Sequence, residues 1–245
     1  IENVLASRYS CDEINSLFTR KKKYSLEREF WISVLKVQIQ FGLKVPTEVV
    51  TRYEKIKDDI DFESINNREL KLKHDVKARI EEFNELAGQE SIHLGLTSRD
   101  VTENIELFQI KIGLTHIQKK SLFLLKLIGN RILEFQDIFF VARTHNVPAQ
   151  LSTLGKRFSV IAEELIYSLT KLNFEISNLP FRGLKGAIGT SSDLLNLFTT
   201  EQIENMELEL AKLYGFEVIQ NSVGQIYPRS IDFSFVSCLV QVADS

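Results

Sequence analysis

Apolar residues recur along most of this 245-residue chain at intervals of three and four positions, the spacing of one face of an α-helix. One such run covers residues 30–41 and another covers residues 76–87. Gly42 and Gly88 follow these runs directly, and glycine is typical of the residue that ends a helix. The pattern therefore predicts two amphipathic helices in the first part of the chain.

Two longer patterns follow. From Ser98 to about Phe140 there is no proline, and apolar residues form two stripes along the helix that this segment predicts. A helix that is apolar on two faces must be buried among several neighbours. After a turn at residues 146–148, a second long helix is predicted from Ser152 to about Ser177. Periodic segments beyond about 25 residues favour a bundle of long helices.

The remaining segments complete an all-α prediction. Residues 185–190 are too rich in glycine for a regular element and suggest a loop that lines a ligand. Residues 191–193 are suited to cap a helix that closes near Gly215, and a last helix is predicted over residues 231–242. We expect a small helical N-terminal domain (1–98) and a long-helix bundle (99–245). The last helix lacks a capping signal, so the C-terminal part of the bundle is expected beyond Ser245.

Composition excludes several classes of function. The net charge of −3 gives no general attraction to nucleic acid, and the basic run at residues 20–23 is interpreted as a solvated loop. No apolar run approaches the roughly 18 residues that would predict a membrane span. Cys11 and Cys238 lie far apart and form no metal or redox motif, which favours a reducing compartment. We expect a soluble cytoplasmic protein with no membrane or nucleic-acid partner.

The four histidines are His74, His93, His116 and His145. None has the spacing of a metal site, so no metal and no cofactor are expected. His145 lies at the junction of the two long helices, where an imidazole could be directed into a cavity and exchange a proton near neutral pH. A structural role in the turn is the alternative.

Two further segments are suited to an anion. Thr97 and Ser98 stand at the start of a long helix, where backbone N–H groups and the helix dipole favour a carboxylate or phosphate. A capping box between Thr97 and Asp100 would explain the same residues without a ligand. Lys73-His74-Asp75 could likewise place a cation and an imidazole at an anion site, or Asp75 could simply cap a helix.

The order of the polar motifs carries more information than any single motif. The series is Arg8-Tyr9, Lys73-His74-Asp75, Thr97-Ser98-Arg99-Asp100, Arg143-Thr144-His145, residues 185–190, and Gln225-Ile226-Tyr227-Pro228-Arg229. Over practically the whole chain this series resembles the adenylosuccinate lyases of the fumarase/aspartase/argininosuccinate lyase superfamily. The resemblance implies a homotetramer with a core of long helices and active sites shared between subunits. It also implies a nucleotide substrate, from which fumarate is eliminated: adenylosuccinate, giving AMP, or the succinylated aminoimidazole carboxamide ribotide of purine biosynthesis.

The resemblance also implies roles for individual residues. His145 would be the general acid, and His74 would support it or bind substrate. Thr97 and Ser98 would hold a succinyl carboxylate. The other substrate-binding residues implied are Arg8 and Tyr9 at the phosphate, Lys73 and Asp75 in the pocket, and Gln225, with residues 185–190 and Arg229 as weaker neighbours.

The chain departs from the family pattern at three places. Asn146-Val147 follows the Thr-His pair where many relatives have a glutamine, and Lys73 stands where arginine is common. The flexible signature loop with the serine base does not occur, so the base is expected beyond Ser245 and the chain alone is expected to be inactive. The alternatives are a sister enzyme such as argininosuccinate lyase, which residues 96–100 fit less well, and a non-catalytic helical scaffold.

Overall fold

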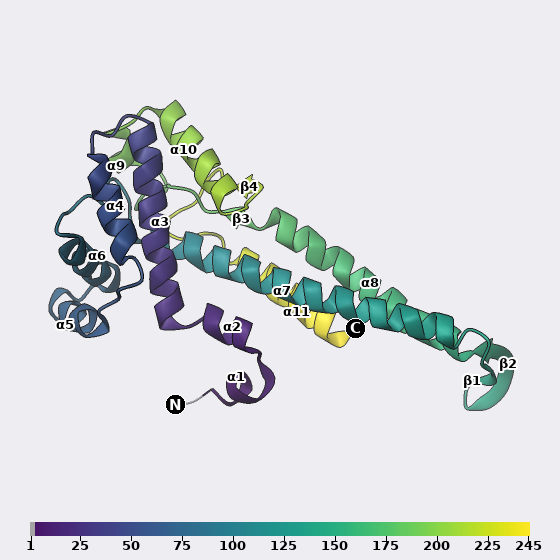
Figure 1. Cartoon of the computed structure of the whole chain (residues 1–245). Coiled ribbons are helices and arrows are strands. Elements are labelled where there is room, and N and C mark those ends of the chain that lie inside the picture. Colours follow the sequence, from purple (N-terminus) through teal and green to yellow (C-terminus); the bar gives the residue numbers. More distant parts are fainter. Residues whose placement is uncertain (1–2) are drawn as a thin grey trace. The chain divides into compact units, whose positions relative to one another are not determined.

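The structure, a computed structural model, describes residues 3–245 and consists mostly of helices (Figure 1). The helices are α1 (Val4–Tyr9), α2 (Asp12–Leu17), α3 (Arg20–Gln40), α4 (Thr47–Ile56), α5 (Phe62–Leu72), α6 (Asp75–Ala87), α7 (Ser98–Glu134), α8 (Leu154–Asn178), α9 (Ser192–Leu195), α10 (Thr200–Leu213) and α11 (Ser230–Asp244). Among the described residues, four strands form two small sheets: β1 (Phe139–Thr144) with β2 (Val147–Thr153), and β3 (Pro180–Phe181) with β4 (Val218–Ile219). None of these helices is long and apolar enough to span a bilayer.

The chain forms two compact units. Unit 1 combines Ile1–Ile110 with Leu179–Pro228, and unit 2 combines Lys111–Asn178 with Arg229–Ser245. Helix α7 begins in unit 1 and continues into unit 2. This division does not coincide with the domain boundary expected at Ser98, and that boundary stays a prediction.

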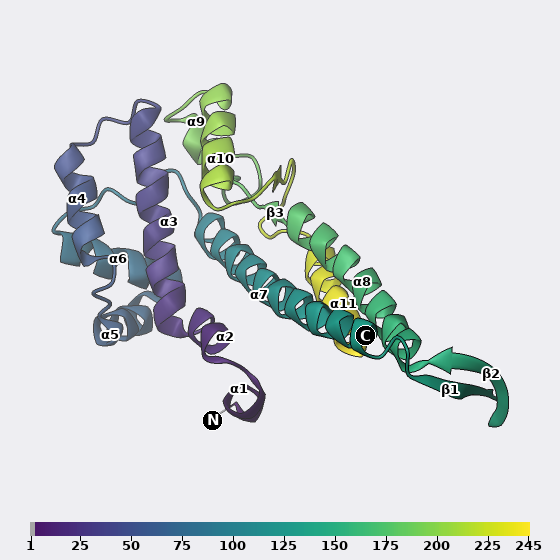
Figure 2. The ribbon, with the colours of Figure 1, turned by 45° about the vertical axis from the view of Figure 1, so that its right-hand side comes forward.

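Unit 1 is built around α3, which packs against α4 and α10 (Figures 1 and 2). Its side chains Phe30 and Trp31 are fully buried, and the Trp31 ring lies 6.4 Å from that of Phe83 on α6. Arg28 of α3 pairs with Glu82 of α6 at 2.5 Å, with both side chains buried. The apolar stripe predicted over residues 30–41 therefore faces the core of this unit.

The junction between α5 and α6 positions the Lys73-His74-Asp75 motif. Helix α5 ends at Leu72; its C-cap, Lys73, adopts the left-handed conformation (φ 56°), and His74 is the N-cap of α6. Asp75 is thus the first residue of α6 and not its cap, and its carboxylate lies 3.2 Å from Arg79 one turn later. The end of α6 at Gly88 (φ 69°) agrees with the sequence-based expectation.

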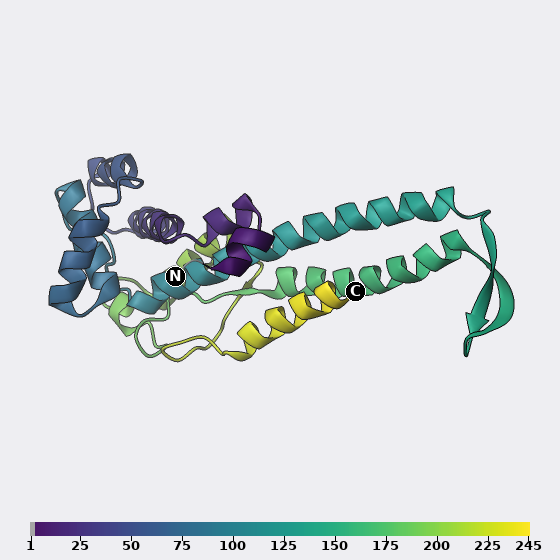
Figure 3. The same ribbon diagram turned by 90° about the horizontal axis from the view of Figure 1, so that it is seen from below.

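Unit 2 contains the later part of α7 together with α8 and α11, and α11 packs against part of the longer α8 (Figure 3). The prediction that the first long helix reaches Phe140 was wrong. Helix α7 ends at Glu134, and residues 139–153 form an antiparallel hairpin in which Thr144 pairs with Val147. The all-α prediction thus holds for most of the chain but not for this hairpin.

One predicted helix is divided in two. The segment between Ser191 and Gly215 forms α9 and α10, because Thr199 starts a new helix through a capping box with Gln202. Elsewhere, the helices predicted to start at Ser98 and near Ser152 begin at Ser98 and Leu154. The chain is mostly helical, as predicted.

Candidate active site

A cavity of about 510 Å³ in unit 1 lies beside the first turn of α7. Its lining comes from α6, from the turn that precedes α7, and from Ser98: His74, Lys77, Ile80, Glu81, Asn84, Glu90, Ile92, His93, Leu94 and Ser98. The structure thus brings together two motifs that are separate in the sequence. The positive end of the α7 dipole at Ser98 favours an anionic group in this cavity.

The hydrogen bonds of His74 define its tautomer. Its Nδ1 accepts the backbone N–H of Lys77 at 3.2 Å, so in the neutral ring the proton resides on Nε2. This Nε2 faces the Ser98 hydroxyl at 3.5 Å. Partial burial raises the pKa of Asp75, but the Arg79 guanidinium and the Val76 N–H together lower it below its usual value. His74 and Ser98 therefore offer an N–H and a hydroxyl side by side.

His93 is a third donor at this cavity, and sequence reasoning did not assign it a role. Its Nδ1 accepts the indole N–H of Trp31 at 3.0 Å. Its backbone is left-handed (φ 65°), and Gly95 follows with φ 69° where a Cβ would lie 2.7 Å from a carbon of Leu194. The only available signal was its place in a short polar turn before a long helix. That turn directs His93 into the cavity that His74 and Ser98 also line.

We expect the stability of unit 1 to fall between pH 7 and pH 5 because of His93. Burial, with a smaller contribution from nearby His74, lowers the pKa of His93 to about 4. In the unfolded chain the pKa is near 6.5, so below that pH only the unfolded state takes up the proton. The loss is about 2 kcal/mol by pH 5. Urea unfolding followed by Trp31 fluorescence at both pH values measures it.

The control for this titration is His93→Asn, which accepts the Trp31 N–H through its amide oxygen, tolerates the left-handed backbone and does not titrate. This variant should lose about 2 kcal/mol less than the parent between the two pH values. Equal losses in both proteins would show that His93 is not responsible.

A buried ionic network holds the loop at residues 183–190 against the start of α7. The Arg182 guanidinium contacts Asp100, and its Nε lies 2.9 Å from Glu103; all three side chains are fully buried. Asp100 Oδ1 also accepts the backbone N–H groups of Lys185 at 3.0 Å and Gly186 at 3.1 Å. Burial raises the pKa of Asp100, and Arg182 is the largest opposing influence.

The same network reaches two other predicted segments. Thr97 donates its backbone N–H to Asp100 Oδ2 at 2.8 Å, which is one half of the capping box that the sequence suggested. The carbonyl oxygen of Gln225 accepts from Arg182 at 3.1 Å, while the Gln225 residue is exposed. Asp100 and Arg182 therefore fix Thr97, the 183–190 loop and Gln225 in one part of unit 1. Sequence reasoning did not assign Arg182 a role.

The other predicted site residues are not all in this cavity. Lys73 and Asp75 line a second cavity, of about 780 Å³, and His74 lines both. Arg8 and Tyr9 form the exposed last turn of α1 and are not among the residues that line either cavity. Their predicted role at a phosphate stays a prediction.

His145 belongs to unit 2, in the two-residue loop of the β1–β2 hairpin. His145 (φ 48°) and Asn146 (φ 63°) both adopt left-handed backbone conformations, as a type I′ turn requires. Asparagine tolerates this conformation well, which explains why a chain without glycine here turns so sharply. The imidazole of His145 is exposed at the tip and is not buried in apolar packing.

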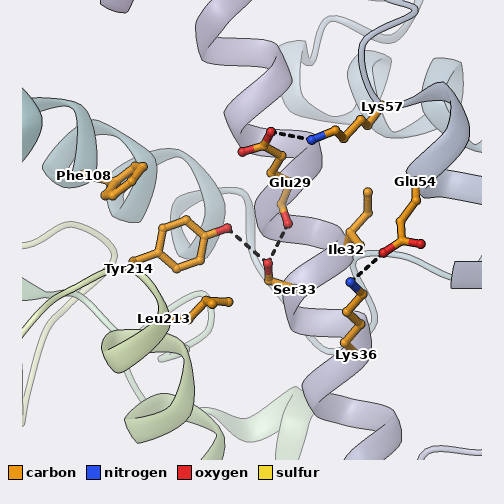
Figure 4. A pocket seen from close by; sticks show the side chains of 9 residues that line it. All are labelled: Glu29, Ile32, Ser33, Lys36, Glu54, Lys57, Phe108, Leu213 and Tyr214. Atoms are coloured by element: carbon orange, nitrogen blue, oxygen red, sulfur yellow. Dashed lines mark hydrogen bonds and ion pairs between the residues drawn. The ribbon is translucent and has the colours of Figure 1, made fainter. Parts of the chain in front are cut away.

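A further cavity of about 590 Å³ in unit 1 has polar groups that are largely paired with one another (Figure 4). Lys57 binds Glu29 at 2.8 Å, and Lys36 binds Glu54 at 2.6 Å. The hydroxyls of Ser33 and Tyr214 lie 3.3 Å apart, and burial raises the pKa of Tyr214 to about 12. Because the polar groups of this cavity already bind one another, a ligand would have to displace them. We therefore place the candidate active site at the cavity lined by His74, His93 and Ser98.

Comparison with known proteins shows similarity along most of the chain. The chain is 30% identical to the adenylosuccinate lyase of Saccharomyces cerevisiae and 29% identical to that of Schistosoma mansoni, with 98% of this chain and 51% of each relative aligned. It is also 31% identical to the adenylosuccinate lyase of Schizosaccharomyces pombe over 96% of this chain. The chain thus spans about half the length of the curated relatives it matches.

Solved structures show the same fold. A fumarate lyase from Mesorhizobium sp. BNC1 superposes with a TM-score of 0.77 at 18% identity, covering 95% of this chain and 54% of that structure. The 3-carboxy-cis,cis-muconate lactonizing enzyme of Pseudomonas putida gives a TM-score of 0.79 at 18% identity, covering 99% and 55%. The long-helix fold expected from the motif order is confirmed. The lyase family matches residues 42–244, and the chain therefore belongs to this family.

Proposed function

We propose that this chain forms part of an adenylosuccinate lyase, which eliminates fumarate from adenylosuccinate to leave AMP. The observation that carries the proposal is the alignment of 98% of the chain with curated adenylosuccinate lyases at about 30% identity. We extend the proposal to the succinylated aminoimidazole carboxamide ribotide, because it carries the same succinyl-amino group.

The cavity beside α7 supports an anionic substrate. A succinyl group carries two carboxylates, and each carboxylate needs hydrogen-bond donors once water is removed. Ser98 and the Nε2–H groups of His74 and His93 are such donors, at the positive end of a 37-residue helix. In this proposal Thr97 and Ser98 hold a succinyl carboxylate, and His74 and His93 bind beside them.

The reaction requires a base and an acid. A base removes the proton from the carbon next to a carboxylate, and the negative charge that develops on that carboxylate is stabilised by hydrogen-bond donors. The carbon–nitrogen bond then breaks, its electron pair moves to the nitrogen of the leaving AMP, and the acid protonates that nitrogen. We assign the acid to His145, on a hairpin tip that leaves its ring exposed. Arg8, Tyr9, Lys73, Asp75 and Gln225 complete the proposed substrate-binding set.

The proposal includes a cytoplasmic homotetramer whose active sites combine residues of different subunits. Large apolar side chains of unit 2 are exposed on its three long helices, which suits burial against further helices. They include Leu122, Phe123, Leu127, Val160, Ile161, Phe174, Phe233, Val236 and Val240. Sedimentation that shows only monomers at micromolar concentration would contradict this part of the proposal.

Turnover of competing substrates tests the proposed function. With protein expressed from the complete gene, we expect adenylosuccinate to be cleaved to fumarate and AMP, and argininosuccinate to be left intact. Ser98→Ala removes one hydroxyl donor and should raise KM about tenfold, the cost of one charge-assisted hydrogen bond. The matched control is Ser64→Ala, in α5 and outside the cavity. Cleavage of argininosuccinate alone would identify a sister enzyme, and cleavage of neither would favour a scaffold.

A further inference from the structure

Trp31 is the only tryptophan of the chain, and its single polar side-chain atom, the indole nitrogen, forms a hydrogen bond with a residue of the candidate active site. The side chain is 1% exposed, in the core of unit 1 on α3. Its indole N–H donates to Nδ1 of His93 at 3.0 Å, and the two rings meet edge to face at 79° with centroids 6.0 Å apart. A buried indole N–H needs an acceptor, and here the acceptor is a residue that lines the cavity.

This hydrogen bond decides which ring nitrogen of His93 carries the proton. A neutral imidazole has one donor and one acceptor nitrogen, and indole N–H can only donate. Nδ1 is therefore the acceptor, and the proton resides on Nε2, on the ring edge turned away from Trp31. A second proton on Nδ1 would face the indole N–H, so the contact also disfavours the charged imidazolium.

We propose that Trp31 is a positioning residue for substrate binding: it fixes His93 as the Nε2–H tautomer, so that the cavity receives a hydrogen-bond donor and not an acceptor. The inference rests on the proposed function, because a carboxylate substrate needs a donor at this position. The opposite tautomer would turn a lone pair toward a carboxylate oxygen and repel it.

The tautomer of His74, the other histidine at the cavity, is also fixed by a hydrogen bond to Nδ1, but from a different donor. His74 also uses Nδ1 as an acceptor, but from the backbone N–H of Lys77. Both imidazoles that line the cavity are therefore held with Nε2–H as the available donor. His74 is fixed by the helix backbone and His93 by a side chain from α3, so a change of side chain can alter the His93 tautomer without altering the backbone.

The test is Trp31→Phe, which keeps an aromatic ring in the core and removes the donor together with part of the indole ring system. Long-range ¹⁵N–¹H correlation spectra of the 245-residue chain distinguish the protonated from the unprotonated imidazole nitrogen, and His93→Asn identifies the His93 signals. We expect the parent to show Nε2–H alone for His93 between pH 6 and 8. The variant should show both tautomers and a raised pKa for His93. Tyr24→Phe, a buried substitution on the same helix, should change neither.

Substituting the single tryptophan by 3-benzothienylalanine removes the N–H with almost no change in shape, and this replaces Trp31→Phe if that variant does not fold. In protein expressed from the complete gene, we expect either change to raise KM for adenylosuccinate about tenfold with little change in kcat. An unaltered His93 tautomer, or an unaltered KM despite a changed tautomer, would overturn the role of Trp31. A changed tautomer in a protein that does not cleave adenylosuccinate would instead overturn the proposed function.

Discussion

Replacing His145 by asparagine is expected to lower kcat for adenylosuccinate cleavage by about 10²- to 10⁴-fold, the usual contribution of a general acid. Asparagine is the appropriate substitution because residue 145 has φ 48° in the hairpin turn, where alanine would add backbone strain. The amide cannot protonate the leaving nitrogen, whereas binding of the substrate is retained. Initial rates of fumarate release from protein expressed from the complete gene measure the effect.

The control is Asn146→Gly at the second position of the same turn, where φ is 63°. Glycine suits this position of a type I′ turn, so the hairpin is kept and the activity should change less than threefold. A rate loss in Asn146→Gly as large as that in His145→Asn would show that the turn geometry matters and that the imidazole does not act as the acid.

Replacing Arg182 by methionine is expected to destabilise unit 1 by about 3–5 kcal/mol, because the change leaves the buried Asp100 without its guanidinium partner and removes from Glu103 a guanidinium at 2.9 Å, while Arg99 stays 3.8 Å away. Asp100 and Glu103 are both fully buried beside Arg182. Water cannot solvate them there, and the loop at residues 183–190 loses one of the groups that anchor it to α7. Urea unfolding followed by Trp31 fluorescence reports on unit 1, since Trp31 is the only tryptophan.

An exposed ion pair in the same unit provides the comparison. Lys36 is 53% exposed and binds Glu54, so Lys36→Met should cost less than about 1 kcal/mol. Adding Asp100→Asn and Glu103→Gln to the Arg182→Met variant removes both buried carboxylate charges and should restore part of the loss. If Arg182→Met costs no more than Lys36→Met, the buried network does not stabilise the unit.

The helices could be predicted where periodicity and end signals agreed. Gly88 ends α6 in the left-handed conformation, and Ser98 starts α7, as the sequence indicated. The β1–β2 hairpin could not be predicted in the same way, because both of its faces are largely exposed and burial imposes little alternation of polar and apolar residues. Its turn carries Asn146 in place of the glycine that usually marks such a hairpin.

The candidate site could be predicted in part. The sequence predicted that Lys73-His74-Asp75 and Thr97-Ser98 could bind an anion, and the structure brings His74 to 3.5 Å from Ser98. Arg182 and His93 were missed, because what distinguishes each is a partner far away in the sequence: Asp100 for Arg182, and Trp31 for His93. Local pattern and spacing do not reveal such pairs.

The hairpin that carries His145 also has two outer edges with unpaired peptide groups, and exposed strand edges invite another chain to add a strand. Its own irregularities oppose this. Pro148 in β2 lacks an N–H group, and the extra residue at the register shift, Ala149, also lies in β2, since Ala142 pairs with Gln150 and Arg143 with Pro148. A further strand therefore finds no continuous ladder to extend along β2, which opposes self-association at that edge of the ribbon.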